Sequence, residues 1–311
     1  MTTAAPVLVA DVGGTHVRVA VVDGTTILAR SRERADLASI VAIDSVDAER
    51  QVIDTLVAAC APMRELFPQL AAAAIGFPGF FRGDSGVLAA SPNLPLLREF
   101  PLAARLSDAL VMPVAVQNDA LMAAIGEARF GAGEGSHSLL HVTLGTGVGG
   151  GLLLDGRPYG GETGMAMEFG HLCVAPGGRL CGCGNRGCLE AYASATAVAR
   201  IYAERSGRKL DAGEIHTAAI QGDQIAVDVL HDAGNALGMA MAMAVNLLDI
   251  HLVSVGGGLS GAWSYLLPAI EAGLQEHVIT PQRGEVRVVR SLLGDDAPLF
   301  GAATLACRLP G

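Results

Sequence analysis

The sequence predicts an α/β protein with two related halves. Its 311 residues exceed the size at which a single hydrophobic core usually keeps growing, so two domains are favoured. Strand-like and helix-like apolar patterns alternate, and a unit of strand, glycine-rich turn and strand occurs around Gly13 and again around 145–150. We expect an N-terminal domain of residues 1–118 plus about 299–311, and a larger C-terminal domain of residues 119–298.

In the first half, three strands precede the first helix. Two β-rich runs flank Gly13-Gly14, and Asp23-Gly24 separates the second run from a third, a pattern typical of consecutive hairpins. Apolar spacing and turn residues then predict a helix at about 47–66, a buried strand in 71–77 before the Pro78-Gly79 turn, a helix in 100–110, a strand in 113–117 and a helix in 120–133.

The second half repeats this order in outline. Its predicted elements are strands in 138–144 and 151–159, helices in 194–206 and 224–248, a strand in 251–255, a helix in 264–278, a strand in 286–291 and a closing helix from about 299. No low-complexity linker separates the halves, so any hinge is expected to be short.

The charge and the apolar segments exclude several classes of protein. Lys and Arg total 21 against 31 Asp and Glu, a net charge of -10, which leaves few cations to neutralise a nucleic acid, so small molecules are the expected ligands. No basic segment precedes the first apolar run, so we expect no signal peptide and a cytoplasmic protein. The apolar segment 236–250 is shorter than the roughly 20 residues that a membrane span needs, so we expect a buried helix and no membrane partner.

Two glycine-rich turns fit the dinucleotide-binding pattern G-x-G-x-x-G. Residues 145–150, "GTGVGG", precede a strand and not the helix that this motif requires. Residues 256–261, "GGGLSG", do precede a helix, but the next strand has no acidic residue at its end before Asp295. A nicotinamide-dependent dehydrogenase therefore remains only a minor alternative.

A third turn, Asp11-Val-Gly-Gly-Thr15, offers a carboxylate, backbone N–H groups and a hydroxyl at the tip of a hairpin. Such a concave set of N–H groups can bind an anion without a helix. Each turn taken alone is more often ordinary turn chemistry, in which glycine supplies a positive φ. The three together match the parts needed to bind a triphosphate and adenosine.

Asn118 and Asp119 stand where a predicted strand passes into a helix. Both residue types are favoured as helix caps, which is the simpler explanation. The alternative is a general base, because phosphoryl transfer needs a carboxylate that orients the acceptor hydroxyl and takes its proton.

Three of the six cysteines, Cys181, Cys183 and Cys188, gather in "LCGCGNRGCLE". A disulfide, a metal site and a chance feature of a glycine-rich loop are the alternatives. A reducing compartment makes a disulfide the less favoured of these and metal binding the more favoured. Cys60 and Cys173 lie outside the pattern and are expected to be ordinary small core residues.

Eight motifs occur in an order that resembles the ROK family of bacterial sugar kinases and related repressors, within the actin-like ATPase superfamily. They are "DVGGT", "GFPG", "SPNL", "QNDA", "LGTGVGGG", "EFGH", "CGCGNRGCLE" and "VSVGGG". The resemblance runs from about residue 7 to the final helix. It implies two actin-like (ribonuclease H-like) α/β domains around an interdomain cleft, and ATP-dependent phosphorylation of a hexose 6-hydroxyl.

The resemblance also implies the site residues. The implied ATP-binding residues are Asp11, Gly13, Gly14, Thr15, Gly145, Thr146, Gly147, Gly149, Gly150, Gly256, Gly257 and Gly258. The implied sugar-contacting residues are Gly79, Asn93, Asn118, Asp119, Glu168, His171 and Glu190. Among them, Asp119 is the implied catalytic base, and Mg²⁺ bound with ATP is expected near Asp11.

A structural Zn²⁺ is a further implication of the resemblance, with His171, Cys181, Cys183 and Cys188 as its ligands. Four N/S ligands with no open position are typical of a structural site. Since His171 and Glu190 also belong to the implied sugar site, we expect the cluster to hold these two residues in place. Loss of zinc is then expected to lower sugar affinity before it affects ATP binding.

The substrate is left open by departures from the family pattern. His16 ends the first phosphate turn where Lys is common, "GMAM" precedes the Glu-x-Gly-His motif, and "SPNLPLL" lacks the Trp of many glucokinases. Glucose is the first expectation, with N-acetylmannosamine, N-acetylglucosamine, allose and fructose as alternatives. A transcriptional repressor is disfavoured because Asp11 lies too near the start for a preceding DNA-binding domain, and a non-catalytic sugar sensor is a remote alternative. The resemblance implies a homodimer.

Overall fold

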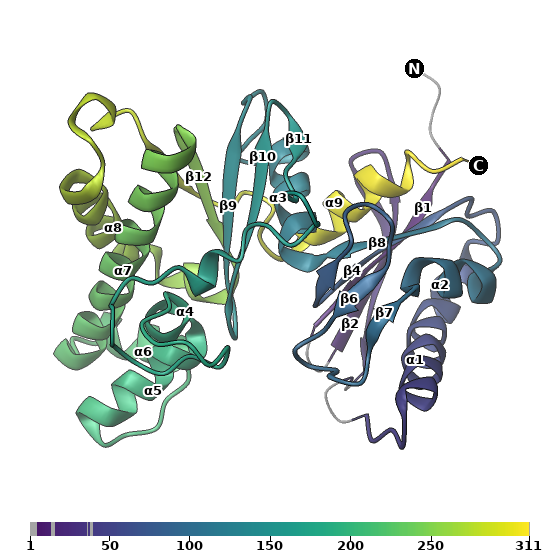
Figure 1. Ribbon diagram of the computed structural model, residues 1–311, viewed down its shortest axis with the longest axis horizontal. Helices are drawn as coiled ribbons and strands as arrows, with labels where there is room; N and C mark the ends of the chain where they lie inside the picture. Colours follow the sequence, from purple (N-terminus) through teal and green to yellow (C-terminus); the bar gives the residue numbers. More distant parts are fainter. Residues whose placement is uncertain (1–4, 14–15, 36, 38–39, 311) are drawn as a thin grey trace. The chain divides into compact units, whose positions relative to one another are not determined.

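A computed structural model describes residues 5–13, 16–35, 37 and 40–310. The chain divides into two compact units (Figure 1). The first comprises Met1–Gly131, Pro158–Ala166 and Asp296–Gly311, and the second comprises Ala132–Arg157 and Met167–Asp295. Each unit is built on a five-stranded sheet with flanking helices, so the predicted α/β fold class is confirmed.

The sheet of the first unit has the strand order β3-β2-β1-β4-β8. Its strands are β1 (Val7–Val12), β2 (His16–Asp23), β3 (Thr26–Arg34), β4 (Ala73–Phe77) and β8 (Val114–Asn118). The first three strands pair antiparallel as the predicted hairpins, whereas β4 and β8 run parallel to β1. The carboxyl ends of β1, β4 and β8 therefore lie at one edge of the sheet.

Helices cover both faces of this sheet. They are α1 (Ser45–Leu66), α2 (Leu102–Leu110), α3 (Asp119–Phe130) and α9 (Ala297–Ala306). Alternate side chains of β1 point to opposite faces, so Leu8 joins the core formed with α1 and α2, and Val9 joins the core formed with α3 and α9. A small antiparallel sheet of β5 (Phe80–Phe81), β6 (Leu88–Ala90) and β7 (Arg98–Phe100) completes the unit.

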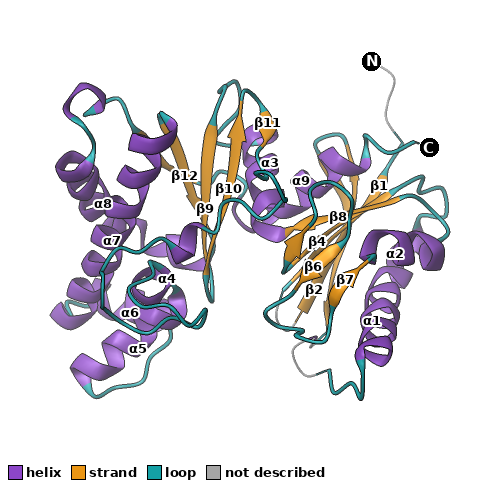
Figure 2. Cartoon of the chain, in the orientation of Figure 1, coloured by secondary structure: helices purple, strands orange, loops and turns teal. Residues whose placement is uncertain are grey.

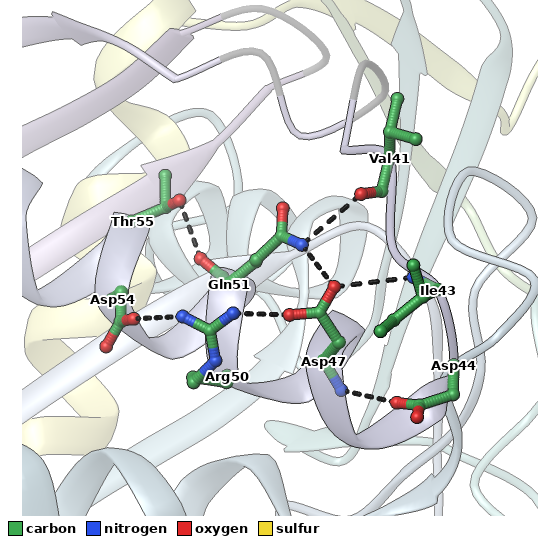
Figure 3. A network of polar contacts seen from close by, with 8 residues as sticks. All are labelled: Val41, Ile43, Asp44, Asp47, Arg50, Gln51, Asp54 and Thr55. Atoms are coloured by element: carbon green, nitrogen blue, oxygen red, sulfur yellow. Dashed lines mark hydrogen bonds and ion pairs between the residues drawn. The ribbon is translucent and has the colours of Figure 1, made fainter.

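Figure 3 shows the polar network at the start of α1. The Asp44 carboxylate caps the helix by accepting a hydrogen bond of 2.8 Å from the backbone N–H of Asp47. The Asp47 carboxylate pairs with Arg50 and accepts a second hydrogen bond, 2.8 Å long, from Gln51 Nε2. The hydrogen bond from Arg50 is the main reason that the pKa of Asp47 is lowered. The helix begins slightly before the predicted start because Asp44 is its cap.

Two glycines bring α3 and α9 into backbone contact. A Cβ atom on Gly301 would lie 1.8 Å from the Met122 carbonyl oxygen, and one on Gly126 would lie 2.1 Å from the Ala297 carbonyl oxygen. This close packing places α3 in the first unit, although the predicted domain boundary assigned residues from 119 onwards to the C-terminal domain. The alternation of strands and helices along the chain carries no information about which helices touch.

The second unit contains the sheet β11-β10-β9-β12-β13. Its strands are β9 (Leu139–Leu144), β10 (Val148–Leu154), β11 (Arg157–Pro158), β12 (Leu252–Gly256) and β13 (Arg287–Arg290). The strand β10 begins at Val148, inside the predicted glycine turn, because Gly149 and Gly150 pair with β9. The turn itself is therefore confined to Gly145–Gly147.

The α-helices of the second unit, purple in Figure 2, follow β11 in the sequence. They are α4 (Glu190–Ala193), α5 (Ala195–Ser206), α6 (Ala212–Ile220), α7 (Gln224–Leu248) and α8 (Trp263–His277). One large core joins these helices to β9, β10 and β12. Among the described residues, no helix is both long and apolar enough to cross a membrane, and α7, the most apolar long segment, is packed into this core.

Candidate active site

A buried carboxylate lies near the end of β1. Asp11 is 7% exposed and stands opposite Arg18 in the antiparallel pair of β1 and β2. Arg18 Nε donates a hydrogen bond of 3.1 Å to Asp11 Oδ2, and Arg18 Nη2 makes a second, shorter contact with the same oxygen. A buried carboxylate is costly unless it is paired, so the ion pair with Arg18 offsets part of the cost of burying Asp11. The sequence analysis missed Arg18, although the two residues lie at symmetric positions on either side of the turn.

Asp11 and Asp119 lie on either side of the same glycine. Asp11 is the register partner of Gly76 on β4. A Cβ atom on Gly76 would lie 3.4 Å from Asp11 Oδ1 and 3.6 Å from the Cα atom of Asp119. The missing side chain at this position therefore leaves space between the two acidic residues that were expected to bind Mg²⁺ and to act as the base.

Asn118 and Asp119 were both candidates for the cap of the following helix. Asn118 Oδ1 accepts a hydrogen bond of 3.1 Å from the backbone N–H of Leu121, so Asn118 is the cap of α3. Its Nδ2 donates to the Gly79 carbonyl oxygen at 3.1 Å. The Asp119 carboxylate accepts a local hydrogen bond of 2.9 Å from Ala120 N–H. The side-chain cap of α3 is thus Asn118.

The other predicted site residues of the first unit lie on turns and connecting segments. Asn93 is exposed on the segment between β6 and β7. At Gly79, a Cβ atom would lie 2.5 Å from Leu88 Cδ1 and 3.0 Å from the Ala90 carbonyl oxygen, so a larger residue would force Leu88 to shift. Gly13 donates from its backbone N–H to the His16 carbonyl oxygen at 2.9 Å, which closes the first glycine turn. Gly14 and Thr15 lie outside the described residues.

In the second unit, the turn Gly145–Gly147 joins β9 to β10. The turn contains Thr146 and is closed by a hydrogen bond of 3.0 Å from Gly145 N–H to the Gly147 carbonyl oxygen. Glu190 Oε2 accepts a hydrogen bond of 3.0 Å from the backbone N–H of Val148, directly after the turn. Glu190, predicted as a sugar contact, therefore touches the predicted ATP turn as well.

The third glycine segment brings the end of β12 close to the end of β9. Gly257 has φ +82° and a Cβ atom there would lie 2.4 Å from the Leu144 carbonyl oxygen, so no other residue fits without strain. Gly256 ends β12 and Gly258 begins a 3₁₀ turn, Gly258–Ala262. Beside them the sequence analysis missed a buried polar pair, in which His141 Nδ1 lies 2.8 Å from Ser254 Oγ.

The predicted metal ligands converge. The ligand atoms of His171, Cys181, Cys183 and Cys188 all lie within 4.8 Å of one another. Cys183 Sγ is 3.7 Å from Cys188 Sγ, and Cys181 Sγ is 3.7 Å from His171 Nδ1. Four ligands at about 2.0–2.3 Å from a tetrahedral Zn²⁺ would be separated by about 3.3–3.8 Å, and these two pairs have that spacing. All six cysteines are free thiols, which removes the disulfide alternative for this cluster.

Glycines shape the hairpin that carries the cysteines. Cys181 N–H donates to the Asn185 carbonyl oxygen at 2.8 Å, and Gly184 N–H donates back to the Cys181 carbonyl oxygen at 3.0 Å. Gly184 and Gly187 have φ +91° and +82°, which explains why glycine is interspersed among the thiols. Burial raises the pKa of the Cys188 thiol to about 12, so metal binding there must displace a proton.

The two ring nitrogens of His171 face different partners. Its Nδ1 points to Cys181 in the cluster, while its Nε2 lies 3.8 Å from Glu168 Oε2. Burial is the main cause that raises the pKa of Glu168, and the His171 charge acts in the opposite direction. A carboxylate beside the outer nitrogen of a ligating histidine is a common means of orienting the ring. His171 was predicted both as a metal ligand and as a sugar contact. The two roles are compatible, because Nδ1 faces Cys181 and Nε2 faces Glu168.

Comparison with known proteins identifies the family to which the chain belongs. The ROK family model matches residues 7–308. The glucokinase of Thermotoga maritima is 36% identical over 245 residues, 74% of this chain and 77% of that protein. The N-acetyl-D-glucosamine kinase of Mannheimia succiniciproducens is 30% identical over 306 residues, 95% of this chain and 97% of that protein.

A solved structure extends the likeness to the fold. A ROK family glucokinase from Streptomyces griseus, in complex with glucose and AMPPNP, has a TM-score of 0.83 and 32% identity, and covers 97% of this chain and 99% of that one. The family match, the similarity to the N-acetyl-D-glucosamine kinase and the solved structure each cover nearly the full length of the sequence. The chain belongs to the ROK family.

Proposed function

We propose that this ROK protein transfers the γ-phosphoryl group of ATP to the 6-hydroxyl of a hexose, with glucose as the first candidate. The observation that carries the proposal is the placement of Asp11 and Asp119 on either side of Gly76, at one edge of the first sheet. Phosphoryl transfer requires a carboxylate that accepts the hydroxyl proton and a second anionic group near the metal-bound phosphates. Asp119 takes the first role and Asp11 the second.

In this mechanism the residues of the chain mainly position and orient the sugar hydroxyl and the phosphates. Asp119 takes the proton of the attacking hydroxyl, and Asn118 holds the start of α3, and so Asp119, against the Gly79 carbonyl. The N–H groups of the glycine turns donate hydrogen bonds to phosphate oxygens, which stabilises the charge that develops there. Mg²⁺ carried with ATP supplies charge neutralisation, and Asp11, an oxygen ligand of the type this ion prefers, is the residue proposed to hold it.

The residues proposed to contact sugar hydroxyls are Gly79, Asn93, Asn118, Asp119, Glu168, His171 and Glu190. The alternatives to glucose remain N-acetylmannosamine, N-acetylglucosamine, allose and fructose. Met165 is 36% exposed, whereas Met167 packs against the core of its unit, so Met165 is the more accessible of the two methionines that depart from the family pattern.

The experiment is a coupled assay of ADP release over a panel of hexoses and N-acetylhexosamines. We expect turnover that requires ATP, Mg²⁺ and one of these sugars. Asp119→Asn is expected to lower turnover by about 10²–10⁴-fold, the usual contribution of a general base, while the variant still binds sugar. Activity on none of the sugars would overturn the kinase proposal, and substantial turnover by Asp119→Asn would remove Asp119 from its role.

Two further assignments are proposed on separate observations. The Cys₃His cluster is proposed to hold one structural Zn²⁺, because its four N/S donor atoms converge within 4.8 Å of one another and two of the pairs are 3.7 Å apart. A homodimer is supported by apolar side chains on the outer face of α7, where Met243 is 39% and Leu247 81% exposed. Metal analysis of the purified protein tests the first assignment, and light scattering with Leu247→Glu tests the second. A monomeric mass for the unmodified protein would contradict the dimer.

A further inference from the structure

The turn Gly145–Gly147 is attached at both ends to the segment that follows the last cysteine. Ala195 N–H donates to the Gly145 carbonyl oxygen at 2.9 Å, and Val148 N–H donates to Glu190 Oε2 at 3.0 Å. Glu190 and Ala195 are the first residues of α4 and α5. Both hydrogen bonds therefore join the turn to the same segment, residues 190–195, which follows Cys188 in the sequence.

Glu190 also contacts the metal cluster. Its second carboxylate oxygen, Oε1, lies 3.8 Å from Cys181 Sγ, and the preceding residue, Leu189, is fully buried in the core of the unit. One side chain thus reaches the glycine turn with one oxygen and a metal-binding thiol with the other. A carboxylate has about four acceptor positions, so these contacts leave capacity for a sugar hydroxyl.

The residues around Glu190 and Val148 are closely packed. A Cβ atom on Gly147 would lie 2.4 Å from Glu190 Oε2. On the other flank of the cluster, a Cβ atom on Gly170 would lie 2.2 Å from the Val148 carbonyl oxygen. Gly170 directly precedes the metal ligand His171. The first residue of β10 is therefore packed between the two chain segments that enter and leave the metal loop, defined as residues 171–188.

We propose that Glu190 is a positioning residue that couples the metal loop to the turn Gly145–Gly147. Metal binding orders the loop, the loop fixes the start of α4, and Glu190 then holds the N–H of Val148. Because such coupling is reciprocal, disturbing the turn must also weaken metal retention. The coupling itself does not depend on the proposed kinase function. Only the identity of the ligand bound at the turn, which is ATP in that proposal, rests on it. The coupling also revises the expectation that metal loss would affect the sugar before ATP, since the predicted ATP turn is directly attached.

The first test uses two matched substitutions in the same turn. Gly147→Ala places a methyl group against Glu190 Oε2, whereas Gly145→Ala meets no atom within 4 Å among the described residues, and neither glycine has a positive φ. We expect Gly147→Ala to release its metal to a chromogenic chelator about 10-fold faster or more, as is usual when a partner next to a ligand is displaced. Gly145→Ala should match the unmodified protein. Equal release from both variants would overturn the coupling.

The second test needs no substitution. Hydrogen exchange followed by mass spectrometry is compared for the metal-loaded and chelator-treated protein, without sugar or nucleotide. We expect faster exchange in the peptide covering 144–152 after metal removal, and no change in β4 of the first unit. Unchanged exchange in 144–152 would overturn the proposal, even if the glycine variants failed to fold.

Glu190 variants separate positioning from general support of the fold. Glu190→Gln keeps an oxygen that can accept the Val148 N–H, whereas Glu190→Ala does not. We expect exchange in 144–152 to stay near that of the unmodified protein in Glu190→Gln and to rise in Glu190→Ala. Equal exchange in both variants would contradict the role of this hydrogen bond. None of these measurements uses phosphoryl transfer, so a failure of the proposed kinase activity would leave them interpretable.

Discussion

The contact between α3 and α9 allows a quantitative test through Gly301→Ala. The new Cβ atom would lie 1.8 Å from the Met122 carbonyl oxygen and 2.6 Å from the carbonyl carbon, and 3.1 Å from the Gly126 nitrogen. All three are backbone atoms, so no side-chain rotation can relieve the overlap. Real Cβ contacts are at least 3.0 Å, so the helices must separate by more than 1 Å.

Separation of these helices opens a fully buried interface. Met122 and Ala302 have no exposed surface, and overpacking of such a site costs typically 1–3 kcal/mol and occasionally more. We expect a loss of about 3 kcal/mol in the free energy of unfolding. At about 2–4 °C per kcal/mol for a domain of this size, the melting temperature should fall by about 6–12 °C. Since α3 begins at Asp119, turnover should fall as well.

Differential scanning calorimetry measures the melting temperature, and the coupled assay measures turnover. Gly261→Ala is the matched control, because Gly261 is exposed, has no positive φ and has no atom within 4 Å of an added Cβ. It should leave the melting temperature unchanged or raise it slightly, since Gly→Ala restricts the unfolded chain. A Gly301→Ala protein that melts within about 2 °C of the unmodified one would refute the reasoning, because that shift corresponds to no more than about 1 kcal/mol.

Three further predictions concern single side chains. Arg18→Met removes an ion-pair partner of the buried Asp11 carboxylate, and we expect the free energy of unfolding in denaturant to fall by about 1–3 kcal/mol. An unchanged stability would contradict a stabilising role of this ion pair. Asp44→Ala removes the cap of α1 and should cost about 1 kcal/mol by the same measurement, with Asp44→Asn, which keeps an acceptor, as the control. Burial raises the pKa of Cys60 to about 12, so alkylation at pH 8 should modify the exposed Cys173 and spare Cys60 until the protein is unfolded; labelling of native Cys60 would contradict its burial.

Much of the local structure could be predicted because it depends on neighbouring residues. The hairpin at Asp23-Gly24 forms because Gly24 adopts φ +57°, and the long α7 follows its apolar spacing. The cysteine cluster was also recognisable, since its three thiols and His171 are held by one short stretch of chain. These features need little knowledge of what packs against them.

Other parts of the site depended on contacts between distant residues. The sequence left Asn118 and Asp119 as alternative caps of the next helix, and only the hydrogen bond from Leu121 N–H to Asn118 Oδ1 identified Asn118 as the cap. The space beside Gly76 became meaningful only when β1, β4 and α3 were placed together. No spacing rule connects these positions, because they are joined by strand register and helix packing.

The sequence by itself determined the α/β class and the family resemblance, because apolar patterns and short motifs are encoded by neighbouring residues. It also predicted the glycine turns and, through the resemblance, the metal ligands. Only the tertiary structure decided that α3 packs with α9 in the first unit and that Glu190 connects Val148 to Cys181. The physical reason is the same in both cases. A missing Cβ atom permits close approach, but the atom that it approaches is selected by the fold and not by the neighbouring sequence.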